Sequence, residues 1–197
     1  MKNSKTQRIK ESITEVEYKR LINFTKRDDE IKDFTKERFL KIYAILFYTG
    51  IRINEISQLR VEDLKSIINN GEVKIVTHKQ NMERKLYFSQ NAIQAIKKLF
   101  ASDLLLDDDV KLIRKLNKPY ASLSNVNMIN TINKHMQKAL GDSGYTSHSF
   151  RQGLITEYAS RGVNTRIIQM FIGHRDSKTT MRYIRPTEND IRGALVR

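Results

Sequence analysis

The stretch Phe39–Glu55 has the sequence FLKIYAILFYTGIRINE. Its apolar residues recur at the i, i+3, i+4 and i+7 spacing of one helical face, at Phe39, Ile42, Tyr43 and Leu46. This spacing predicts an amphipathic helix with an apolar stripe, and Gly50 is expected to end it. Two charged residues, Arg52 and Glu55, follow within five residues of that glycine. The stretch therefore predicts a core helix followed directly by a charged segment.

The chain on either side of this helix adds further elements. After Asn69-Asn70-Gly71, which is expected to be a turn, residues alternate at 73–77 and again at 84–88, and this predicts a short β-hairpin or small sheet. Helical spacing returns in three sets: Ile93, Ile96 and Phe100; Ile129, Ile132, Met136 and Leu140; and Ile167, Met170 and Phe171. The predicted fold class is mainly α with a small antiparallel β-sheet (α+β).

The composition limits the class of protein. The 197 residues are enough for one domain with its own core, and they include no cysteine, which excludes disulfides, zinc-thiolate sites and thiol nucleophiles. The longest apolar run, Tyr43 to Tyr48, is too short to cross a bilayer. We therefore expect a cytoplasmic protein with no membrane partner.

The charge is strongly basic and unevenly distributed. The chain has 36 basic and 22 acidic residues, for a net charge of +14. Residues 1–110 carry 21 basic and 17 acidic side chains, and residues 111–197 carry 15 and 5. Such an excess favours a nucleic-acid partner, because each phosphate that is neutralised releases counterions. A ribosomal protein or a merely basic soluble protein would show the same excess, so charge alone does not identify the partner.

Two pairs of polar residues stand near expected helix ends. Arg52 and Glu55 are three residues apart, and so are His148 and Arg151, so each pair can share one helical face. An ordinary ion pair is the alternative for the first, and a chance neighbourhood is the alternative for the second. Neither pair is specific when taken alone.

Two further segments lie near the C-terminus. Gly173 and His174 close an apolar stretch. The alternative to a functional role is a helix C-cap whose histidine is favoured by the helix dipole. Tyr183 lies between two arginines, nine residues after His174. On one unbroken helix His174 and Tyr183 would lie on opposite faces, so we expect a break at 175–177. The alternative for Tyr183 is a core aromatic residue whose hydroxyl has a partner.

The order and spacing of these segments resemble the tyrosine recombinase (phage integrase) family from about Ser12 to the end of the chain. Each motif alone is weakly specific, but together they place six catalytic residues in the family's order. The resemblance implies a set of catalytic residues: Arg52 with its acidic partner Glu55, Lys79 at the tip of the hairpin, His148 and Arg151 of a His-x-x-Arg motif, His174 of a Gly-His motif, and the nucleophile Tyr183.

Two features depart from the family's pattern. Gln152 follows Arg151 where many members have a second histidine, and little precedes Ser12, where members usually carry a helical core-binding domain. We expect a basic N-terminal tail at 1–11 and a catalytic domain at 12–197, with the core-binding domain absent. Such a chain is either a catalytic domain cut from a longer protein or a small recombinase that lacks the DNA clamp. The stretch 161–169 looks similar to the fimbrial-switch invertases, which are small recombinases that lack the clamp.

The resemblance implies a site-specific recombinase or integrase that cuts and rejoins double-stranded DNA through a 3′-phosphotyrosyl intermediate, with no cofactor, metal or ATP. Arg52 and Arg151 would bind the non-bridging phosphate oxygens, because a guanidinium can donate two parallel hydrogen bonds. Tyrosine, whose ordinary pKa is about 10, is a poor nucleophile when protonated, and His148 would be the base that activates Tyr183. Lys79 would protonate the leaving 5′ oxygen, and His174 would hydrogen-bond the phosphate.

The resemblance also implies assembly. Strand exchange between two duplexes implies a homotetramer on DNA, formed from a free protein that is expected to be monomeric. The C-terminal segment, residues 187–197, has Ile191, Ala194 and Leu195 at helical spacing. This stripe would dock either on a neighbouring subunit or on its own domain.

Three other functions account for part of these observations. A metal-dependent nuclease would need carboxylates that hold cations, and the acidic run Asp107, Asp108 and Asp109 lies in an expected surface loop. A type IB topoisomerase shares the tyrosine chemistry but relaxes DNA without a defined site. A non-catalytic DNA-binding regulator would not need the nucleophile.

Overall fold

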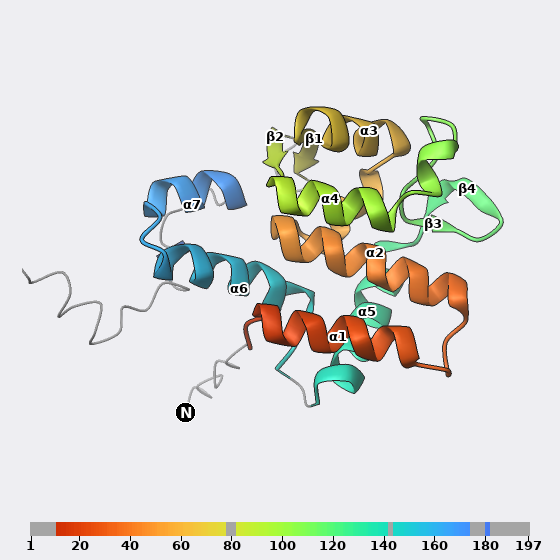
Figure 1. Ribbon diagram of the computed structural model, residues 1–197, viewed down its shortest axis with the longest axis horizontal. Helices are drawn as coiled ribbons and strands as arrows, with labels where there is room; N and C mark the ends of the chain where they lie inside the picture. Colours follow the sequence, from red (N-terminus) through yellow and green to blue (C-terminus); the bar gives the residue numbers. More distant parts are fainter. Residues whose placement is uncertain (1–10, 78–81, 142–143, 174–179, 182–197) are drawn as a thin grey trace, which may run out of the picture.

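A computed structural model describes residues 11–77, 82–141, 144–173 and 180–181 of the chain (Figure 1). In chain order its elements are α1 (Glu15–Arg27), α2 (Asp33–Thr49), the 3-10 helix η1 (Ile53–Gln58), α3 (Val61–Asn70), β1 (Glu72–Thr77), β2 (Met82–Tyr87), α4 (Gln90–Leu99), the 3-10 helix η2 (Asp103–Leu105), β3 (Arg114–Lys115), β4 (Lys118–Ser122), α5 (Asn125–Leu140), α6 (Ser147–Ser160) and α7 (Thr165–Ile172). The strands form two antiparallel pairs, β1 with β2 and β3 with β4. The prediction of a mainly α fold with a small antiparallel sheet is confirmed.

The expected hairpin is the pair β1 and β2. Its register places Val73 opposite Leu86 and Ile75 opposite Arg84. Val73, Ile75 and Leu86 are buried, so the alternation identifies the face that packs on the core. Arg84 shares this inward face, although its side chain is charged. The hairpin therefore brings a guanidinium to the inner side of a small sheet.

Two local features differ from the sequence-based expectation. Residues 69–71 were expected to be a turn, but α3 continues to Asn70 and ends at Gly71, whose φ of 71° is the left-handed conformation that glycine favours. The pair β3 and β4 was not predicted. Its strands are short, none of their residues is buried, and they lack the apolar alternation that marks a strand in a sequence.

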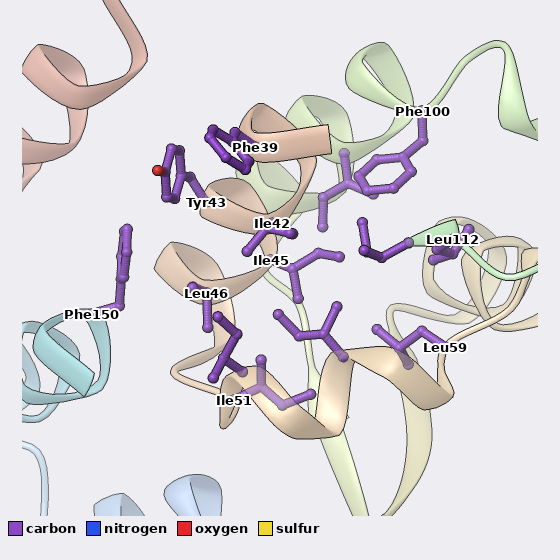
Figure 2. Close-up of a cluster of buried hydrophobic side chains, with 14 of the residues drawn as sticks. Phe39, Ile42, Tyr43, Ile45, Leu46, Ile51, Leu59, Phe100, Leu112 and Phe150 are labelled. Carbon is purple, nitrogen blue, oxygen red and sulfur yellow. The ribbon is translucent and has the colours of Figure 1, made fainter. Parts of the chain in front are cut away.

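Helix α2 lies at the centre of the core. All residues from 41 to 46 are buried, so neighbours surround the helix on every side and the single stripe expected from spacing is too narrow. Figure 2 shows its apolar side chains lying near residues from several other parts of the chain, among them Ile51, Leu59, Phe100, Leu112 and Phe150. Lys41 is buried as well, and its amine lies 2.5 Å from Asp103 Oδ2, which neutralises the charge inside the core.

Helix α7 forms where helical spacing returns, but the face predicted to be apolar is wrong. Ile167 and Met170 are 59% and 70% exposed, whereas Ile168 and Ile172 are fully buried against α6. The sequence of this helix, TRIIQMFI, has apolar residues on more than one face, so spacing alone does not select the buried one. Helices α6 and α7 lie beside each other at one end of the molecule (Figure 1, blue).

Helix α6 is held against the segment before α1. The backbone N–H of Ile13 donates to Ser149 O at 3.0 Å. A Cβ atom at Gly153 would lie 2.0 Å from the carbonyl oxygen of Ile13, so a side chain cannot be accommodated there without moving the backbone. This contact fixes the helix that carries His148 and Arg151.

Candidate active site

Three helices meet where α2 ends. Gly50 adopts φ of 57°, and its N–H donates to Leu46 O, which closes the helix. A Cβ atom at Gly50 would lie 3.0 Å from Ile172 Cδ1 and 3.6 Å from Arg151 Cα, so α6 and α7 pack directly on this turn. Both the positive φ and the close packing require glycine. The turn leads within two residues to Arg52.

Arg52 and Glu55 form the ion pair that their spacing allows. Arg52 Nη1 lies 3.1 Å from Glu55 Oε1, and the backbone N–H of Arg52 donates to Glu55 Oε2 at 3.2 Å. The Glu55 side chain is 1% exposed and that of Arg52 is 32% exposed. The carboxylate is therefore buried beneath the arginine, whose guanidinium stays accessible to a ligand from solvent.

Arg84 is a second partner of Glu55 that the sequence analysis did not assign to the site. Arg84 Nη2 lies 2.9 Å from Glu55 Oε2, and Nη1 donates to Phe171 O in α7 at 3.1 Å. Burial lowers the pKa of this guanidinium, while the charge of Glu55 raises it. The available signal was an arginine on the inward register of an otherwise apolar alternation.

Arg151 is buried between the ends of two helices. Its Nη1 donates to Gly50 O at 2.8 Å, and its Nη2 donates to Ile172 O at 2.7 Å. Both acceptors lie at helix C-termini, where unpaired carbonyls and the helix dipole favour a cation. These two bonds use two of the five N–H donors of the guanidinium. The structure therefore places Arg151 next to the turn that precedes Arg52.

His148 lies in the first turn of α6, three residues before Arg151 as predicted, and it is exposed. Phe150 and Leu154 are buried on that helix. The other three predicted site residues, Lys79, His174 and Tyr183, lie outside the described residues, and so does the break expected at 175–177. Lys79 falls in the chain between β1 and β2, and His174 directly follows Gly173, the C-cap of α7.

The acidic run at 107–109 makes surface contacts. Asp108 pairs with Lys65 and Asp109 pairs with Arg60, both at 2.5 Å. Over the part of the chain that the structure describes, no group of three or more His, Cys, Asp or Glu side chains is arranged to hold a metal ion. Asp108 and Asp109 thus lie at the surface, each paired with one basic side chain. None of the described helices has the length and apolarity needed to cross a bilayer.

Comparison with known proteins identifies the relatives of this chain. A model of the phage integrase family matches residues 11–190. The tyrosine recombinase XerA of Pyrococcus furiosus is 27% identical over 186 residues, which are 94% of this chain and 61% of that protein. The tyrosine recombinase XerD of Staphylococcus epidermidis is 29% identical over 168 residues, 83% of this chain and 56% of that protein. The chain thus spans little more than half the length of these curated relatives.

Solved structures share the fold. The crystal structure of XerA recombinase matches with a TM-score of 0.69 at 23% identity, covering 93% of this chain and 63% of that one. The Tn1549 transposon integrase in complex with transposon right end DNA matches with a TM-score of 0.73 at 19% identity, covering 98% and 67%. The family model covers nearly the whole chain and includes every predicted site residue. The chain therefore belongs to the phage integrase family of tyrosine recombinases.

Proposed function

We propose that this chain is the catalytic part of a site-specific DNA recombinase or integrase, which cuts and rejoins strands through a 3′-phosphotyrosyl bond to Tyr183. The observation that carries the proposal is the arrangement of the two arginines around one turn. Arg151 is bonded to Gly50 O, and Arg52 follows Gly50 by two residues. Family membership supplies the chemistry that this pair would serve.

Each described residue has a physical basis for its proposed role. Arg52 is accessible to a phosphate, and Glu55 orients its guanidinium from below. Arg151 is fixed before any substrate binds, because carbonyls hold two of its nitrogens. Fixed donors stabilise charge that develops in a transition state without a cost of reorganisation. His148 is exposed, lies one helical turn from Arg151 and would accept the proton of the Tyr183 hydroxyl.

The remaining steps rest on the resemblance. Lys79 would protonate the 5′ oxygen as the strand breaks, and His174 would hydrogen-bond the phosphate. The 3′-phosphotyrosyl bond conserves the energy of the broken phosphodiester, so a free 5′ hydroxyl can attack it and rejoin the strand. The proposed reaction therefore needs no metal, ATP or other cofactor.

Double-stranded DNA is the proposed partner. The protein would form a homotetramer on the DNA and be a monomer without DNA, and its proposed location is the cytoplasm. The Tn1549 integrase was solved in complex with transposon DNA, and XerH was solved bound to its difH substrate. The net charge of +14 supports a polyanionic partner for this chain as well.

Covalent capture tests the proposal. Nicked duplexes that tile the DNA flanking the gene should yield, with one of them, a protein–DNA adduct that survives denaturation and forms in EDTA. Tyr183→Phe should abolish the adduct and leave DNA binding nearly unchanged. An undiminished adduct in that variant would remove Tyr183 from the role, and a strict need for Mg²⁺ would favour a metal-dependent nuclease. Relaxation of plasmids that lack the captured site would favour a type IB topoisomerase.

A further inference from the structure

We propose that Arg84 is a positioning residue that holds Arg52, through Glu55, and the C-terminal end of α7 in one fixed arrangement. The consequence for catalysis rests on the proposed function, whereas the positioning itself does not. Arg84 lies on β2, its side chain is only 11% exposed, and it is bonded at both terminal nitrogens, to Glu55 Oε2 and to Phe171 O. It would therefore act on the site through Glu55 and α7 and not by contact with the DNA.

Glu55 transmits the effect of Arg84 to Arg52. The carboxylate is buried and lies between two guanidiniums, with Arg52 Nη1 on Oε1 and Arg84 Nη2 on Oε2. A buried carboxylate that loses one of its cations turns toward the other or draws in water, because its charge needs compensation. The orientation of Glu55, and with it that of Arg52, therefore depends on Arg84.

The second contact of Arg84 is with the end of α7. The last carbonyls of a helix have no partner within it, and here two consecutive ones are bound by arginines, Phe171 O by Arg84 and Ile172 O by Arg151. The backbone also packs on the Arg84 stem, because a Cβ atom at Gly173 would lie 2.8 Å from Arg84 Cδ. Two cations thus hold the helix end that directly precedes His174.

These contacts close a ring through the site. From Arg52 it runs through Glu55 and Arg84 to the end of α7, then through Arg151 to Gly50 O, two residues before Arg52. In such a ring the position of each arginine depends on the other links. Arg84 is the link that joins the Arg52 side of the ring to the α7 side.

Arg84→Lys is the main test variant, since it keeps a cation for Glu55 but cannot reproduce two bonds from two nitrogens. Arg84→Gln combined with Glu55→Gln is the second variant, and it removes both buried charges together in case the single change unfolds the chain. Lys85→Gln is the matched control, because it neutralises the neighbouring basic residue of β2, which pairs with Glu72 on the surface.

Hydrogen exchange measures the positioning without any activity. The Arg52 amide bonds Glu55 Oε2, and the Gly173 amide bonds Gln169 O and Met170 O at the end of α7. In Arg84→Lys both amides should exchange at least about tenfold faster than in the wild type, and in the double variant the Gly173 amide should do so, since there the acceptor of the Arg52 amide is itself changed. The Gly71 amide, which closes α3 in the same left-handed conformation, should not change. Unchanged exchange at Arg52 and Gly173, or equal acceleration at Gly71, would overturn the proposal.

Kinetics test the consequence for the reaction. At saturating DNA, the cleavage rate of Arg84→Lys should fall by about tenfold to a hundredfold, with the DNA dissociation constant within about threefold, because small misplacement of catalytic groups slows the chemical step. In a protein that already carries Arg52→Lys, Arg84→Lys should slow cleavage much less, since both substitutions act through the Arg52 guanidinium. Wild-type cleavage by Arg84→Lys would refute the catalytic consequence. Failure of the wild type to cleave would count against the proposed function alone, and hydrogen exchange would still decide the positioning.

Discussion

Arg151→Lys would show how much of the role of this arginine is structural. The guanidinium donates from two different nitrogens to Gly50 O and Ile172 O, at 2.8 and 2.7 Å. A lysine ammonium presents all of its donors from one atom, so we expect at least one of the two carbonyls to lose its bond. A buried acceptor left without a partner costs about 1–3 kcal/mol of stability.

Arg52→Lys is the matched comparison for this change. Its contact with Glu55 leaves the arginine 32% exposed, and a lysine ammonium can keep a single bond to the buried carboxylate, so we expect a loss of no more than about 1 kcal/mol. A domain of this size loses about 2–4 °C in Tm per kcal/mol. Arg151→Lys should therefore lower Tm by about 2–12 °C, and Arg52→Lys by less than about 4 °C. Thermal unfolding followed by circular dichroism measures both, and an equal loss in the two variants would refute a structural role for Arg151.

Activity should respond alike in the two variants, in contrast with stability. Lysine keeps the charge but loses the fork that binds two phosphate oxygens, so cleavage should fall by about a hundredfold or more in each. DNA affinity should change little. Single-turnover cleavage and DNA titration, both performed well below the lower Tm, separate the two effects. Parallel losses in binding and cleavage would mean that these arginines only hold the DNA backbone.

Three further predictions concern the rest of the chain. Burial lowers the pKa of His135, so as the pH drops below about 6.5 the unfolded chain takes up a proton that the folded chain does not, and the free energy of unfolding should fall. Urea unfolding from pH 7.5 to 5.5 should show a smaller fall in this free energy for His135→Gln than for the wild type. Gly153→Ala should lower the free energy of unfolding by about 1–3 kcal/mol, because its Cβ would lie 2.0 Å from Ile13 O, and unchanged urea denaturation would contradict that contact. Deletion of residues 187–197 should spare the fold and single-site binding but prevent assembled complexes, and a truncated protein that still forms synaptic complexes in gel filtration would exclude the tail from assembly.

The sequence was sufficient for features set by local spacing. Gly50 ends α2, Arg52 meets Glu55 three residues on, and His148 and Arg151 share the first turns of α6, because helix geometry alone determines these relations. The hairpin strands are where the alternation predicted them. Patterns that repeat within a few residues thus translated directly into structure.

Contacts between distant segments were not accessible in the same way. Arg151 and Gly50 are 101 residues apart, and Arg84 and Phe171 are 87 apart, so no local pattern links them. The buried face of α7 depends likewise on where α6 lies, and Ile168 was therefore missed in favour of Ile167. The alternation of the strand placed Arg84 on its inward face, but only the fold shows that Glu55 and the end of α7 lie there to bind it.

The ring around Gly50 also determines how the protein can be divided. A cut between α5 and α6 leaves Arg52, Glu55 and Arg84 on one fragment and His148 and Arg151 on the other, so neither piece alone carries both arginines. Each fragment also loses a bond that holds one of its arginines, since the bonds from Arg84 to Phe171 O and from Arg151 to Gly50 O cross the cut. Under the proposed function, breakage of DNA would then require the two pieces to associate. The α5–α6 junction is thus the natural place to divide this protein into halves whose reunion can be put under the control of a small-molecule dimeriser or of light.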